Sequence, residues 1–157
     1  MKFQIGFLAV FIFSLLTACS DAVDPTPVTV IDGKLLVNDK GWIVISSVKE
    51  DGTSKKDLLV EYDSCVADNI YKFTTADHYV IDEGEMKCKK NDSQSKESGS
   101  WKLSGTSLVM NPVGDVPYQF TISFLSDEKL VFEYTEIGIN GIVISVTTTT
   151  FKPASAI

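Results

Sequence analysis

The sequence contains no arginine. Planar, bidentate capture of phosphate or carboxylate groups usually relies on the guanidinium group, so a nucleotide or sugar-phosphate site is not expected. The formal net charge is −7, from 14 basic and 21 acidic residues. An acidic protein is repelled by nucleic-acid phosphates and by anionic lipid headgroups. We therefore expect no nucleic-acid partner.

Histidine is almost absent as well, which limits the catalytic chemistry. The single histidine, His78, follows Asp77 in a predicted turn. A nucleophile–base–carboxylate set would have to use His78, and no serine lies in a G-x-S-x-G context. Acidic residues 82, 83 and 85 lack the alternating spacing of a calcium loop. We expect no enzyme, and no catalytic, cofactor-binding or metal-binding residue.

Charged residues are also missing from residues 5–16, a 12-residue apolar run interrupted only by Gly6 and Ser14 and preceded by Lys2. A spanning helix needs about 20 apolar residues, so this run is too short to cross a membrane. The alternative, a buried core helix, would lack a polar face to meet water. A basic start followed by a short apolar run is typical of a secretory signal peptide, predicted here over residues 1–18.

The four residues that end this segment, Leu16 to Cys19, resemble the lipobox of bacterial lipoproteins. The resemblance implies that Cys19 becomes the acylated N-terminus and that the membrane is a partner through this anchor. Several acyl chains on one residue give stable anchoring. Ser20 is not the aspartate that retains some lipoproteins at the inner membrane, so we expect the outer membrane. The polar, proline-bearing residues 19–33 predict a flexible tether.

Three cysteines are an odd number, and assigning Cys19 to lipid leaves Cys65 and Cys88. An exported protein meets an oxidising compartment, where these two are expected to pair. The enclosed loop of about 24 residues would contribute about 3 kcal/mol to stability. A redox or metal pair would instead show a C-x-x-C spacing or a nearby histidine. A structural disulfide is the prediction.

From Trp42 onward, apolar residues recur with a period of two, and turn residues follow at intervals of about ten. Residues 53–67 and 89–98 show no such pattern and are expected to be loops. Residues 28–37 fit a hairpin, but residues 34–39 could equally form a short helical turn. No longer helix is expected. Consecutive hairpins predict an all-β, eight-stranded antiparallel up-and-down barrel, either filled by side chains or holding one small ligand. The eight expected strands cover residues 42–48, 70–74, 79–82, 100–103, 108–110, 118–125, 130–134 and 142–151.

Residues spread over the predicted barrel resemble the lipocalin-like domain of small bacterial lipoproteins. The resemblance implies a calycin-type barrel over residues 34–153, a disulfide between Cys65 and Cys88, and a short turn at 34–39 that closes one end. The chain departs from true lipocalins because glycine directly precedes Trp42 and no arginine can stack on that ring. The resemblance is carried by Gly41, Trp42, Cys65, Asp68, Asn69, Tyr71, Phe73, Gly84, Cys88, Gly99, Trp101, Leu103, Leu108, Leu130 and Phe132.

Aromatic residues decide whether the barrel is filled or hollow. Each buries about 150–250 Å², so the nine on the predicted inward face would fill much of the interior. Two hypotheses remain open: a lipid-anchored envelope lipoprotein that holds a small hydrophobic ligand, or an envelope interaction module with a filled barrel. Residues 53–67 and 89–98 would supply the contact surface in the second hypothesis. The nine aromatics are Trp42, Tyr71, Phe73, Trp101, Tyr118, Phe120, Phe124, Phe132 and Tyr134, of which Trp42, Phe73, Trp101, Phe120 and Phe132 are the candidate ligand-lining residues.

Overall fold

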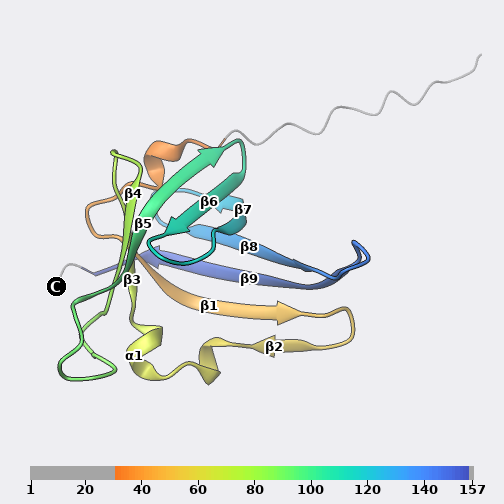
Figure 1. Cartoon of the computed structure of the whole chain (residues 1–157), viewed down its shortest axis with the longest axis horizontal. Coiled ribbons are helices and arrows are strands. Elements are labelled where there is room, and N and C mark those ends of the chain that lie inside the picture. Colours follow the sequence, from red (N-terminus) through yellow and green to blue (C-terminus); the bar gives the residue numbers. More distant parts are fainter. Residues whose placement is uncertain (1–30, 156–157) are drawn as a thin grey trace, which may run out of the picture.

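A computed structural model describes residues 31–155, which form one nine-stranded antiparallel sheet (Figure 1). The strands follow one another in chain order, and β1 also pairs with β9. This extra pairing closes eight of the nine strands into a barrel, as predicted. The strands are β1 (Trp42–Glu50), β2 (Lys55–Asp57), β3 (Ile70–Phe73), β4 (His78–Asp82), β5 (Ser95–Ser104), β6 (Ser107–Pro112), β7 (Tyr118–Leu125), β8 (Leu130–Ile137) and β9 (Val143–Pro153).

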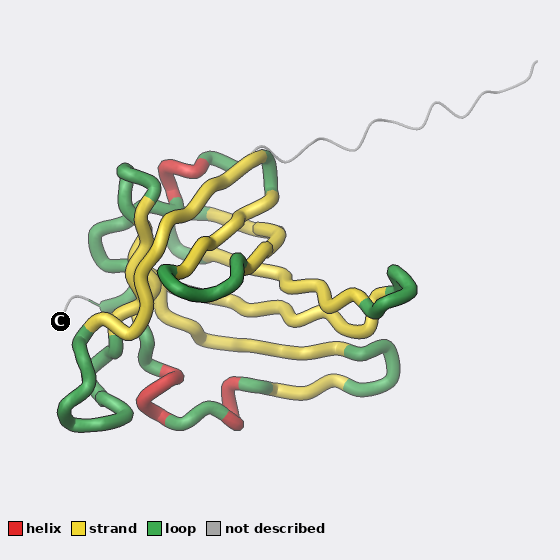
Figure 2. Tube along the Cα trace, viewed as in Figure 1, coloured by secondary structure: helices red, strands yellow, loops and turns green. Residues whose placement is uncertain are grey.

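Two segments expected to be loops contain regular structure, and those expectations were wrong in part. The 53–67 connection holds β2, the 3₁₀ turn η2 (Leu59–Glu61) and the short helix α1 (Ser64–Ala67) (Figure 2). All three β2 residues are exposed, so no buried face marks a strand in the sequence. Residues 95–98, expected in a polar loop, form the first part of β5. β2 pairs only with β1 and stands outside the closed ring.

The chain enters the barrel through the 3₁₀ turn η1 (Gly33–Leu35), so the helical-turn alternative was correct for this part of 28–37. Asp32 caps the turn, since its Oδ1 accepts the backbone N–H of Lys34 at 3.0 Å. The predicted signal peptide, the lipidation site Cys19 and most of the tether lie outside the described residues. No helix within residues 31–155 is long and apolar enough to cross a membrane.

The indole of Trp42 joins η1 to the barrel. Its Nε1–H donates to the backbone oxygen of Leu36 at 2.8 Å, and both side chains are fully buried. Trp42 pairs with Tyr71 of β3 on one side and with Pro153 of β9 on the other. The turn after residue 33 therefore closes one barrel end, as the family resemblance implied.

Cys65 in α1 and Cys88, which follows β4, form the predicted disulfide. The two residues are 23 positions apart in the sequence. The bridge holds the loops that follow β2 and β4 together on one side of the barrel. By the chain-entropy relation, it contributes about 3 kcal/mol to the free energy of unfolding.

Phe124 was predicted on the inward face together with Phe120, and this was wrong. Ile122 pairs with Phe132, but Phe124 pairs with Val131, so Ser123 is an extra residue in β7. Such a bulge reverses the side-chain alternation that follows it. Phe124 is consequently 49% exposed. Lys129 Nζ lies 5.5 Å from the centre of its ring.

Replacing Trp42 by Phe should lower the free energy of unfolding by about 1–3 kcal/mol, because the buried Leu36 carbonyl loses its donor. Trp101→Phe is the matched control: the Trp101 Nε1–H donates at 3.2 Å to the carbonyl of Thr74, an exposed residue, where water can replace it. Urea unfolding of both variants measures the difference. An equal decrease in the free energy of unfolding for both variants would show that the hydrogen bond to Leu36 contributes no more than the one to Thr74.

Candidate functional site

The barrel is solid at one end and hollow at the other. Near η1, the rings of Phe73 and Trp101 meet edge to face with centroids 5.8 Å apart, and both are buried. Phe132 lies next along the interior, with its centroid 6.5 Å from that of Phe73. Beyond Phe132 the interior opens into a cavity of about 350 Å³.

Every strand of the closed ring contributes to this cavity, because residues at alternate positions point to the barrel interior. Phe120 stacks on Phe132 with centroids 5.3 Å apart, and Phe151 meets Phe132 at 4.9 Å. The lining consists of Val44, Ser47, Tyr62, Tyr71, Ile81, Glu97, Met110, Tyr118, Phe120, Phe132, Tyr134, Thr147, Thr149 and Phe151.

Incomplete strand pairing accounts for the opening. β1 pairs with β3 only at Trp42 and Ile43, and then continues along β9 and β2. The pairing of β7 with β8 likewise stops at Thr121 and Glu133, while β8 runs on to Ile137. The far halves of β1, β8 and β9 therefore extend away from β3–β7 as an arm (Figure 1). The cavity lies where the two parts of the barrel separate.

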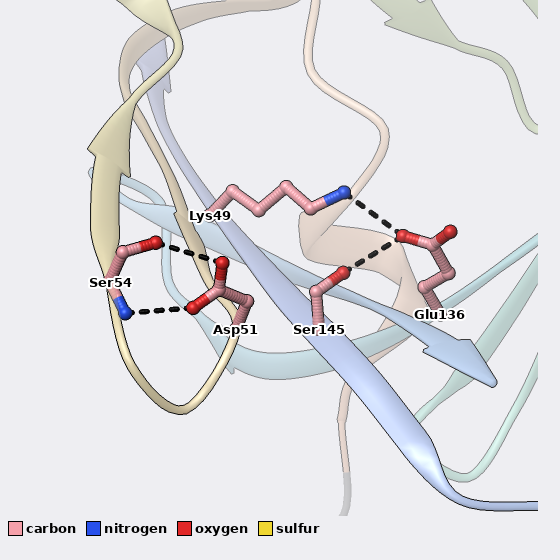
Figure 3. A network of polar contacts seen from close by, with 5 residues as sticks. All are labelled: Lys49, Asp51, Ser54, Glu136 and Ser145. Atoms are coloured by element: carbon pink, nitrogen blue, oxygen red, sulfur yellow. Dashed lines mark hydrogen bonds and ion pairs between the residues drawn. The ribbon is translucent and has the colours of Figure 1, made fainter. Parts of the chain in front are cut away.

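Polar contacts tie the three strands of this arm together (Figure 3). The carboxylate of Glu136 in β8 accepts hydrogen bonds from Lys49 Nζ of β1 and Ser145 Oγ of β9, each at 2.9 Å. These contacts hold the pKa of Glu136 below its ordinary value. At the β1–β2 turn, Asp51 accepts hydrogen bonds from Ser54 and Thr53, which lower the pKa of Asp51.

Glu97 of β5 is the one charged residue in the cavity lining. Its Oε1 accepts the Tyr79 hydroxyl at 2.5 Å. Burial, and then Tyr62 and the Glu97 charge, raise the pKa of Tyr71 to about 12. Burial and Glu97 likewise raise the pKa of Tyr79 and of Tyr118. The tyrosine hydroxyls around Glu97 are therefore neutral at physiological pH.

The five candidate lining residues divide between the two ends of the barrel. Phe120 and Phe132 line the cavity, whereas Trp42, Phe73 and Trp101 pack in the solid end. In the described residues 31–155, no three His, Cys, Asp or Glu side chains are grouped so that they could hold a metal ion.

Glu97 was not predicted as a lining residue. A signal was present, since positions at intervals of two back from Trp101 lead through Gly99 to Glu97. Because the residues around Glu97 are polar, no alternation of apolar and polar residues revealed which of them face the interior. Thr147 and Thr149 were also missed, although they lie four and two positions before the buried Phe151.

A closed antiparallel barrel with a side-chain-filled end and an apolar cavity at the other defines a calycin-type fold. The family model described as "Lipocalin-like domain" matches residues 40–132, more than half of the chain. The chain therefore belongs to the lipocalin-like domain family. Among solved structures, it is similar to the bovine lipocalin allergen Bos d 2, with 14% identity, a TM-score of 0.40, and coverage of 81% of this chain and 78% of that one. No curated protein sequence matches the chain.

Glu136→Gln should destabilise the protein at neutral pH by weakening the contacts to Lys49 and Ser145. A carboxyl whose folded-state pKa is lowered stabilises the fold above its ordinary value of 4.5, and this contribution is lost as the pH falls through the lowered pKa. The difference between variant and wild type should therefore shrink from about pH 7 to about pH 3.

Urea midpoints across this pH range measure the effect. Glu133→Gln is the control, because Glu133 lies in the same strand and forms no ion pair among the described residues. A Glu136→Gln deficit that does not change with pH would contradict a role for the charged carboxylate.

Proposed function

We propose that this protein is a lipid-anchored lipoprotein of the cell envelope whose barrel holds a small hydrophobic ligand. The observation that supports binding is the cavity of about 350 Å³, lined mainly by aromatic and aliphatic side chains. Ligand sites are concave and mostly apolar, with a few polar groups and volumes of about 300–1,000 Å³. Membership of the lipocalin-like domain family agrees with this function.

The size of the cavity limits the ligand. One water molecule occupies about 30 Å³ in the liquid, so the volume of the cavity equals that of roughly a dozen water molecules. A ligand on the order of a dozen non-hydrogen atoms would fill the cavity. A long acyl chain would have to extend out of the open end.

The envelope location rests on the N-terminal sequence. The short apolar run before Cys19 and the lipobox resemblance support export and acylation, with the outer membrane as the favoured destination. In this proposal the barrel binds its ligand without catalysing a reaction, in keeping with the binding role proposed for this lipocalin-like domain. The anchor would keep the binding barrel at the membrane surface.

Thr147→Phe should block the cavity, because Thr147 lines it. The adjacent residue Thr148 pairs with Glu133 and points to the opposite face of β9. Thr148→Phe therefore introduces the same ring outside the barrel. We expect the wild type and Thr148→Phe to bind the neutral probe indole-3-ethanol, and Thr147→Phe to bind it at least tenfold more weakly.

Isothermal titration calorimetry of the purified full-length chains measures the affinities, and urea unfolding checks that both variants are folded. Native mass spectrometry of the wild type would add the mass of any co-purified small molecule. Absence of binding by the wild type, or equal binding by the two variants, would contradict a ligand site in the barrel.

A second function, contact with another envelope protein, is supported by the tip of the β8–β9 hairpin. Ile137, Ile139 and Ile142 are exposed there, and the tip projects beyond the barrel (Figure 1). Exposed apolar groups of this kind mark contact surfaces. We expect photo-crosslinking from position 140 to capture one envelope protein, and the double variant Ile139→Ser, Ile142→Ser to lose it. Crosslinks to lipid alone would contradict this function.

A further inference from the structure

The charges in the cavity indicate which kind of ligand it accepts. Among its fourteen lining residues, Glu97 is the only acidic residue, and no lysine, arginine or histidine is present. The surrounding tyrosines are neutral at physiological pH because burial and the Glu97 charge raise the pKa of Tyr71, Tyr79 and Tyr118. The lining therefore carries one negative charge.

Glu97 has no cationic partner within the described residues. The four ion pairs there use other carboxylates: Glu136, Glu50, Glu61 and Asp82. Glu97 Oε1 receives the Tyr79 hydroxyl, and Oε2 forms no hydrogen bond in residues 31–155. A cation placed beside a carboxylate that has no counter-charge stabilises it.

Aromatic rings around the carboxylate complete a site for a positive charge. Tyr118 and Phe120 have centroids 6.3 Å apart, and both line the cavity with Glu97. The face of an aromatic ring attracts an ammonium group, more strongly when water is excluded. A carboxylate ligand would find no basic residue in the lining and would be repelled by Glu97.

We propose that the cavity binds a small apolar or aromatic amine whose ammonium group pairs with the Glu97 carboxylate while its hydrocarbon part packs against Phe120 and Phe132. This inference rests on the proposed ligand-binding function and deepens it. Tyr79 holds the carboxylate in place, and the open Oε2 receives the ammonium group.

Three indole derivatives of nearly equal size test the proposal: the cation tryptamine, the neutral indole-3-ethanol and the anion indole-3-acetate. Titration calorimetry of the full-length protein should show tryptamine binding about tenfold more tightly than the alcohol, as expected for a charge-assisted hydrogen bond, with the acid weakest. Glu97→Gln keeps an acceptor for the Tyr79 hydroxyl and removes the charge. This variant should lose the preference and bind tryptamine and the alcohol with about equal affinity.

Glu133→Gln is the matched control, since it removes the same charge from the outer face and should keep the preference. Equal binding of tryptamine and the alcohol by the wild type, or a preference that survives Glu97→Gln, would overturn the amine proposal and leave the ligand-binding function standing. Failure of all three compounds to bind would overturn both.

Discussion

Closure of the barrel depends on two residues of β1. Trp42 and Ile43 pair with β3 on one side and with β9 on the other, whereas the rest of β1 pairs with β9 and β2. The first of these residues also carries the indole that holds η1 through Leu36. Trp42 therefore both joins β1 to its two neighbouring strands and holds the turn that covers this end of the barrel. The solid end of the barrel is built around this buried side chain.

The hollow end follows from the same constraint. After Ile43, β1 leaves β3, so the two parts of the barrel separate and their facing side chains cannot meet across the interior. In β1, the register with β9 shifts between Val44 and Ser46, where this separation begins. In β7, the corresponding irregularity is the bulge at Ser123. The aromatics near η1 fill their end, while those around Phe120 surround a space. The barrel is thus filled by side chains at one end and hollow at the other, whereas the sequence had suggested a barrel that is either filled or hollow throughout.

Strands with one buried face were predictable from the sequence because burial imposes a period of two, as from Trp101 to Leu103 and from Tyr118 to Ile122. β2 was not predictable, because all its side chains meet water. Phe124 was misplaced since one inserted residue reverses the alternation without changing the composition. Two lining residues, Phe120 and Phe132, were named from the sequence, but the end of the barrel that holds the cavity was not predictable. Its position depends on where β1 leaves β3, which is a property of pairing between distant segments.

The chain's charge has two different consequences. The net charge of −7 acts over the whole surface, but salt at physiological strength screens exposed charges beyond about 8 Å. A small ligand inside the barrel would therefore respond to the groups that touch it, and the one charged residue in the cavity lining is Glu97. The absence of arginine then matters locally, because no guanidinium neutralises this carboxylate from within the protein. Selection among ligands of similar size and shape would rest on a single side chain, in a strand whose polar sequence did not suggest an interior position.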